Sequence, residues 1–172
     1  MAANDPNGLI MYTSSFSKLL FPSIRIGFLA IPKSISKYVS NYKKLLNQQS
    51  NTIAQFAVAR WMQEGGFERH LKRTRRAYHA RRDGICEAID DLIYRGYKLS
   101  YTKPDGGMAL WLKTQKDSLS LFETCLQNEI FILPESKCRF QKQKNLNHIR
   151  LGFAGQNEGE LKQGIKALSQ FL

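Results

Sequence analysis

The stretch from Tyr12 to Phe28 constrains this chain most, because hydroxyl side chains, one lysine and one arginine stand there between two apolar segments. The apolar segments are typical of strands, and Pro22 and Gly27 indicate a bend and a close backbone approach. A desolvated lysine loses its proton more easily and forms an imine with an aldehyde. Arginine binds two oxygens of a phosphate, and a serine hydroxyl donates to a third. The stretch therefore predicts a site for an anionic ligand that carries an aldehyde.

Composition limits the class of protein. The 172 residues suffice for a domain with a hydrophobic core, and a hydrophobic share of 42% is ordinary for a globular protein. The net charge of +12 favours a polyanionic partner without identifying one. Apolar runs such as 26–31 are far too short to span a bilayer, so we expect no membrane partner and a cytoplasmic protein. Cys86, Cys125 and Cys138 lack the paired spacing of a disulfide framework or a zinc site, which predicts plain thiols and no metal.

Hydrophobic periodicity predicts short strands and helices in the first two thirds of the chain. The pattern favours a buried strand over residues 9–13, a second strand over residues 24–31, and helices over residues 34–46 and 67–92. Thr52 followed by Gln55 has the form of a capping box, which predicts that another helix begins there.

The last third of the chain alternates in the same way. We expect strands over residues 97–101, 108–112, 130–133 and 148–153, and a helix over residues 119–126. Asn157 and Glu160 have the spacing of a capping box and predict a closing helix. The segment 135–147 is polar, basic and poor in strand formers, so we expect a mobile loop there.

Basic side chains crowd the first half of the long helix. Arginines or lysines occupy seven positions between residues 69 and 82: Arg69, Lys72, Arg73, Arg75, Arg76, Arg81 and Arg82. Two interpretations stay open: a weak, salt-dependent contact with DNA phosphates, or a solvated helix face. We favour the solvated face, because no aromatic stacking platform or DNA-reading motif accompanies the charges.

Residues 15–18, with the sequence Ser-Phe-Ser-Lys, are followed by Pro22, Arg25 and Gly27. This set resembles the lysine motif of fold-type I enzymes that depend on pyridoxal 5′-phosphate (PLP), the aminotransferase family. A solvated loop lysine and a surface arginine are the alternative interpretation. The proline, arginine and glycine at their expected places favour the resemblance over that alternative.

The resemblance assigns roles to four residues. It implies that Lys18 is the catalytic residue and binds the cofactor aldehyde covalently, and that Ser15 and Arg25 bind the cofactor phosphate. Ser17 belongs to the same implied cofactor site. The family residues that contact the pyridine ring come from the part before the lysine, so we expect this chain alone to be inactive as a transaminase.

Later segments resemble the same family. Residues 104–112 are similar to its Pro-x-Gly-Gly-apolar strand, residues 66–83 to its Gly-x-x-x-His…Arg-Arg-Asp helix, and residues 148–154 to a strand whose arginine binds an amino-acid carboxylate. The resemblance implies that Arg150 binds substrate, whereas an arginine facing solvent is the alternative. Glu135 departs from the family, in which a glycine commonly follows the proline, and this puts substrate closure in doubt.

The fold class implied by the resemblance is α/β. It consists of the small C-terminal domain of aminotransferase fold-type I, an antiparallel or mixed sheet flanked by helices, together with the last strands and the long helix of the large domain. We expect residues 1–33 to be a remnant of the large PLP-binding domain, residues 34–92 a helical interdomain segment, and residues 93–172 the small α/β domain.

Two functions follow from the resemblance. Residues 151–168 are similar to the closing segment of MocR-type regulators, which join a DNA-binding winged-helix domain of the GntR type to an aminotransferase-like sensor of an amino acid or PLP. The alternative is the C-terminal part of a class I/II aminotransferase that transfers an amino group between an α-amino acid and a 2-oxo acid. In either case we expect a homodimer with a small amino acid or amine as ligand, and we favour the regulator.

Overall fold

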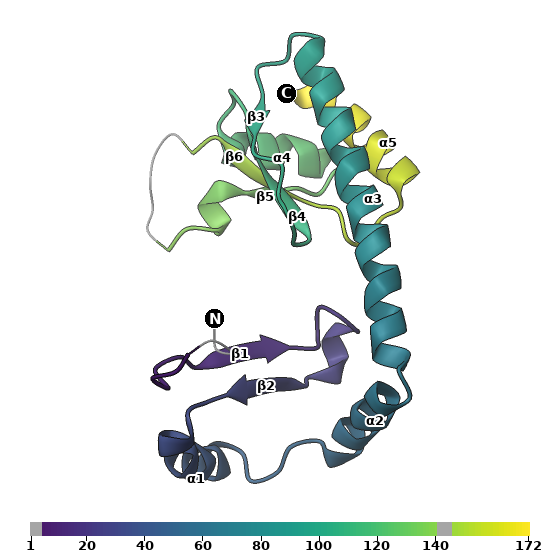
Figure 1. Cartoon of the computed structure of the whole chain (residues 1–172). Helices are drawn as coiled ribbons and strands as arrows, with labels where there is room; N and C mark the ends of the chain where they lie inside the picture. The colour runs from purple at the N-terminus through teal and green to yellow at the C-terminus, as the bar shows by residue number, and fades with distance from the viewer. Residues whose placement is uncertain (1–4, 141–145) are drawn as a thin grey trace. The chain divides into compact units, whose positions relative to one another are not determined.

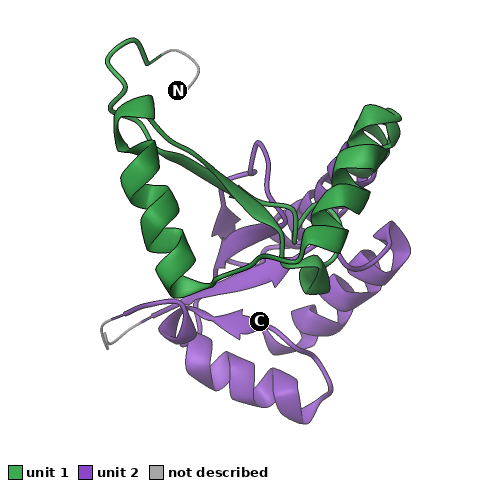
Figure 2. Ribbon diagram, turned by 90° about the horizontal axis from the view of Figure 1, so that it is seen from below, with its two compact units in different colours: residues 1–74 green, residues 75–172 purple. Residues whose placement is uncertain are grey.

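The computed structural model describes residues 5–140 and 146–172, and the chain forms two compact units, Met1–Thr74 and Arg75–Leu172 (Figure 2). The long helix α3 (Gly66–Tyr94) begins in the first unit and continues into the second. Its bounds confirm the helix expected over residues 67–92. The three-part domain scheme stays a prediction.

The N-terminal unit is built on a hairpin of β1 (Tyr12–Ser15) and β2 (Gly27–Ala30), which run antiparallel and side by side (Figure 1). A short 3-10 helix, η2 (Pro22–Ile24), lies in the connection between them. The expected strands were therefore placed wrongly at their starts. The first strand was also expected to be buried, yet most residues of both strands are exposed, because the sheet has only these two strands within the described residues.

Three helical segments follow the hairpin: η3 (Lys33–Ile35), α1 (Ser36–Leu46) and α2 (Thr52–Gln63). The capping box expected at Thr52 is wrong by one residue. Asn51 caps α2, and its side-chain oxygen accepts a hydrogen bond of 3.1 Å from the amide of Ala54. The Thr52 hydroxyl donates instead to the carbonyl of Ser50, so it is not available to the helix end.

The C-terminal unit contains a four-stranded antiparallel sheet in the order β3-β4-β6-β5 (Figure 1). The strands are β3 (Ser100–Tyr101), β4 (Ala109–Lys113), β5 (Leu133–Pro134) and β6 (His148–Gly152). The helices are α4 (Ser118–Gln127), η4 (Glu135–Lys137), α5 (Glu158–Leu168) and η5 (Ser169–Phe171). Strand β5 begins three residues later than expected and includes the proline that was expected to end it.

One face of this sheet forms the core. Alternate residues of β4 and β6 are buried, and they pack with buried residues of α3, α4 and α5, including Ile89, Cys125 and Ile165. Each large aliphatic side chain of this kind contributes about 1.5–3 kcal/mol. The capping box of α5, formed by Asn157 and Glu160, is confirmed.

All three cysteines are free: Cys86 and Cys125 are buried, and Cys138 is exposed. Burial raises the pKa of the Cys125 thiol, as expected for an inert core residue. In the part of the chain that the structure describes, no helix combines the length and the apolar character needed to cross a membrane.

Substitution of Gly66 tests the packing at the start of α3. A Cβ atom at Gly66 would lie 2.2 Å from the indole nitrogen of Trp61, so the ring would have to move. We expect Gly66→Ala to lower the free energy of unfolding by about 1–3 kcal/mol. Gly164→Ala in α5 is the matched control, because a Cβ there meets no atom within 4 Å. Urea unfolding should show Gly164→Ala unchanged or slightly more stable, and equal losses in the two variants would contradict the account.

Candidate functional site

The hairpin brings the predicted cofactor residues to one end of the N-terminal unit. Ser15 is paired with Gly27, and beyond this pair the amide of Phe16 donates to the carbonyl of Ile26 at 2.9 Å. Gly27 is required here, because a Cβ atom would lie 2.8 Å from the carbonyl oxygen of Ser14. The backbone that carries Lys18 and the backbone that carries Arg25 therefore leave the hairpin at the same end.

Lys18 lies in a tight turn. The amides of Leu19 and Leu20 both donate to the carbonyl of Phe16, at 3.0 and 2.8 Å, and these bonds close the turn around the lysine. The Lys18 side chain is exposed. A reactive lysine was expected to be shielded from water, but the described residues leave the Lys18 side chain exposed to solvent.

The two serines of the motif differ in their hydrogen bonds. The hydroxyl oxygen of Ser15 accepts from the amide of Ser17 at 3.2 Å and lies 3.4 Å from the carbonyl of Ile26. The hydroxyl oxygen of Ser17 is buried and has no partner among the described residues. An unsatisfied buried hydroxyl costs about 1–3 kcal/mol, so Ser17 leaves an unmet hydrogen-bonding capacity in the turn that carries Lys18.

Arg25 has a strained backbone. It follows η2 in the left-handed conformation, with φ 47° and ψ 37°. This conformation costs a residue with a side chain about 1–2 kcal/mol, and such strain concentrates at functional positions. Arg25 and Ser17 both lie in the connection between β1 and β2, and the guanidinium supplies the charge and the donors that a phosphate group needs. The residues of the hairpin therefore fit the phosphate of the predicted cofactor.

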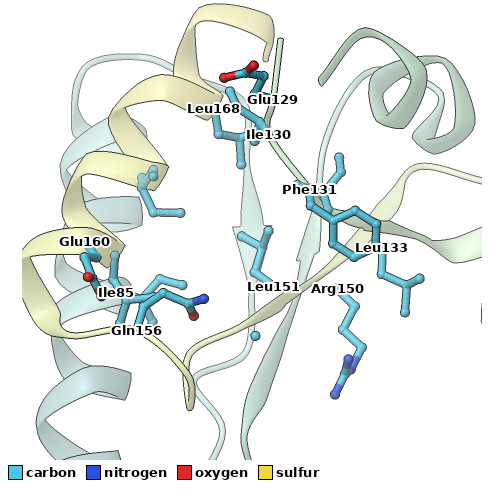
Figure 3. A pocket seen from close by; sticks show the side chains of 15 residues that line it. Ile85, Glu129, Ile130, Phe131, Leu133, Arg150, Leu151, Gln156, Glu160 and Leu168 are labelled. Atoms are coloured by element: carbon cyan, nitrogen blue, oxygen red, sulfur yellow. The ribbon is translucent and has the colours of Figure 1, made fainter. Parts of the chain in front are cut away.

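Arg150 lies in the other unit, on the middle of β6. Its backbone is paired with Trp111 of β4 on one side and with Leu133 of β5 on the other. The side chain is exposed and lies at the border of a cavity of about 470 Å³. Figure 3 shows the guanidinium extending away from the ring of Phe131, while Gln156 lies across the cavity. Within the described residues Arg150 makes no ion pair, so its charge is available to an anion.

Glu135 corrects the prediction of a mobile loop after β5. Its side chain is only 2% exposed, and it accepts hydrogen bonds from Arg139 and from both the amide and Nδ1 of His148. Burial alone would raise the pKa of this carboxyl, but the hydrogen bonds from Arg139 and His148 outweigh it and hold the pKa below its ordinary value. The part of the expected loop at 141–145 lies outside the described residues.

This buried carboxylate connects the start of the predicted loop to the strand of Arg150. His148 is two residues before Arg150, and its ring stacks on Trp111 at a centroid distance of 5.7 Å. From the sequence, Glu135 stood out only as a departure from the family pattern. The spacing of Glu135 and Arg139 by four residues was the available signal for their ion pair.

Comparison with known proteins places the chain in a family. Residues 1–168 match the family described as aminotransferase class I and II. The chain belongs to this aminotransferase family. Its membership confirms the α/β fold class predicted from the lysine motif.

The following relatives, which share the aminotransferase family with this chain, are of two classes. It is 30% identical to an uncharacterized aminotransferase, SSO0104, of Saccharolobus solfataricus, over 96% of the chain and 41% of the relative. It is 29% identical to the uncharacterized HTH-type transcriptional regulator YisV of Bacillus subtilis, over 99% of the chain and 34% of YisV. The probable rhizopine catabolism regulatory protein MocR of Rhizobium meliloti is also 29% identical, over 100% of the chain and 35% of the relative. The chain thus spans between a third and about two fifths of these proteins.

A solved structure supports the same fold. The kynurenine aminotransferase of Pyrococcus horikoshii, solved in complex with PMP, matches 98% of the chain with 42% of its own length at a TM-score of 0.86 and 28% identity. This likeness agrees with the antiparallel sheet and flanking helices of the C-terminal unit. Ser15, Ser17, Lys18 and Arg25 lie together in the N-terminal unit, whereas Arg150 lies in the C-terminal unit.

Acid unfolding tests the role assigned to Glu135. A depressed carboxyl pKa contributes stability that is present above the unfolded value of about 4.3 and is lost as pH falls through the lower folded value. We expect Glu135→Gln to lower the free energy of unfolding by about 2 kcal/mol at pH 7 and by clearly less near pH 3. Urea unfolding at both pH values measures this difference. Glu123→Gln, at an exposed position of α4, is the control, and equal effects of the two substitutions would show that the carboxylate of Glu135 has no special role.

Proposed function

We propose that this chain is the PLP-binding, aminotransferase-like part of the effector domain of a MocR/GntR-family transcriptional regulator. The observation that supports cofactor binding is that the Lys18 turn, the unpaired Ser17 hydroxyl and Arg25 all lie in the connection between β1 and β2, at one end of the hairpin. The matches to YisV and MocR, over 99% and 100% of the chain, support the regulator.

Each residue of the proposed site has a stated task. Arg25 binds two phosphate oxygens of PLP through its guanidinium, and the hydroxyls of Ser17 and Ser15 complete the phosphate site. The Lys18 amine holds the cofactor by its aldehyde carbon. When bound, PLP supplies an electrophilic carbon and an acceptor for electrons. Arg150 binds the carboxylate of a small amino acid, or of an amine that carries one.

The regulator requires a DNA-binding domain outside this chain. Such a domain, of the winged-helix type, would precede the aminotransferase-like part in a cytoplasmic homodimer. The basic segment 69–82 adds at most a weak contact with DNA. Arg81 donates to the backbone carbonyl of Ala154 and Arg82 to that of Pro104, and both side chains are only partly exposed. These two arginines are therefore poorly placed to bind DNA phosphates.

A class I/II aminotransferase is the second candidate. The matches to SSO0104 and to the kynurenine aminotransferase favour it. In that enzyme the Lys18 amine would move a proton at Cα of the amino acid, and Arg150 would orient the substrate carboxylate. Steady turnover of an amino acid and a 2-oxo acid by the full-length protein would favour the enzyme. Operator binding that responds to an amino acid, without turnover, would favour the regulator.

Trapping with borohydride tests the cofactor site directly. PLP is added to the chain, the mixture is reduced with borohydride, and the modified lysines are identified by mass spectrometry of peptides. We expect Lys18 to be the most heavily modified lysine and Lys18→Ala to lose that modification. Arg25→Lys keeps the charge but removes the fork, so labelling of Lys18 should require about tenfold more PLP.

Exposed lysines react with PLP without a site, so an internal control is needed. Lys33 is an exposed lysine a few residues beyond the hairpin. Preferential labelling of Lys18 over Lys33, suppressed by inorganic phosphate, supports the proposal. Equal labelling of the two lysines, unaffected by Arg25→Lys, would remove it.

A further inference from the structure

His70 contacts the turn that carries Lys18. Its Nε2 atom lies 2.7 Å from the carbonyl oxygen of Leu19, a residue 51 positions earlier in the chain. A carbonyl oxygen only accepts hydrogen bonds, so Nε2 of His70 carries the hydrogen and donates it. The bond joins the first turns of α3 to the residue that directly follows the proposed PLP lysine.

The turn around Lys18 is anchored at one side by its own backbone. The amides of Leu19 and Leu20 bond to the carbonyl of Phe16, and the amide of Phe16 bonds to Ile26 across the hairpin. These bonds use the amides of the turn and the carbonyl of Phe16, but they leave the carbonyl of Leu19 to another partner. The bond from His70 to Leu19 supplies such a partner, and it holds the peptide unit next to Lys18 from the side of α3.

The His70 ring is itself held in place. The hydroxyl of Thr74, one helical turn further along α3, lies 3.3 Å from the same Nε2 atom. The indole of Trp61 lies against the ring at a centroid distance of 5.6 Å. Trp61 also packs edge-on against Phe67, and Phe67 packs edge-on against Phe16 at the start of the turn. The donor therefore approaches the turn from a fixed direction.

We propose that His70 is a positioning residue for Lys18: its Nε2–H group holds the Leu19 carbonyl and thereby fixes the turn from which the lysine reaches the cofactor. The inference rests on the proposed function for the identity of the ligand, but the effect on the turn is independent of any ligand. Holding a reacting group in the right geometry lowers the barrier to reaction. A turn that is fixed from two sides therefore favours attack of the Lys18 amine on an aldehyde.

A matched pair of substitutions isolates the hydrogen bond. His70→Gln places an amide NH2 group close to the position of Nε2, whereas His70→Asn places it near the position of Nδ1, too short to reach Leu19. Amide hydrogen exchange is measured at Leu19 and Leu20 in the chain without PLP. We expect about fivefold faster exchange in His70→Asn and nearly unchanged exchange in His70→Gln.

The second measurement is borohydride trapping of PLP on Lys18 in the same variants. We expect the labelled fraction to fall about fivefold in His70→Asn and to be retained in His70→Gln. His79→Asn, at an exposed histidine of the same helix, is the control and should change neither measurement. Exchange that is equally fast, or equally slow, in both His70 variants would overturn the proposal.

The two measurements separate the two hypotheses. If the unsubstituted chain takes up no PLP on Lys18 but His70→Asn still accelerates exchange at Leu19 and Leu20, the cofactor site is wrong while the contact that fixes the turn is supported. If Lys18 is labelled and His70→Asn changes neither exchange nor labelling, the cofactor site stands and the positioning role of His70 is wrong.

Discussion

The close approach of two backbones in the hairpin is the constraint on which the proposed site depends. Gly27 passes so near the carbonyl of Ser14 that any side chain there would collide with it. This approach lets Ser15 pair with Gly27 and Phe16 bond to Ile26, and it brings the ends of β1 and β2 together. The pairing register of β1 and β2 therefore fixes where the Lys18 turn and Arg25 leave the hairpin.

The chain itself supplies some of the chemical groups that a PLP site needs. Its own residues provide an amine, a guanidinium and an unpaired hydroxyl. The exposure of Lys18 and of apolar hairpin residues such as Leu29, which is 48% exposed, indicates surface that a partner would cover. The C-terminal unit has a closed core of its own, and the buried Glu135 joins the segment after β5 to the strand that carries Arg150.

The sequence predicted the helices well, because amphipathic spacing over many residues is a strong signal for α1, α3 and α5. It also predicted the bend at Pro22 and the close backbone approach at Gly27, whereas the binding of one ligand by Lys18 and Arg25 stays a prediction. It failed where a single distant partner decides the outcome. A glutamate usually lies on the surface, but Glu135 is buried and accepts a hydrogen bond from the amide of His148, 13 positions further along the chain. Likewise, no local pattern could show that His70 donates to Leu19 or that the hydroxyl of Ser17 lacks a partner.

Boundaries failed for a more local reason. Asn51 and Thr52 are both good helix caps, and only the geometry of the preceding loop selects Asn51. The strands of the hairpin begin later than their apolar runs, because an apolar run marks residues suited to burial, whereas the ends of a strand are set by its pairing register.

A crystal structure of the chain soaked with PLP tests the central claim most directly, namely that Lys18 and Arg25 serve the two ends of one coenzyme. The account predicts continuous electron density from Lys18 Nζ to the coenzyme, with its phosphate beside the Arg25 guanidinium and within hydrogen-bond distance of the Ser17 hydroxyl. Density at Lys18 with the phosphate turned away from Arg25, or coenzyme bound to a different lysine, would contradict it.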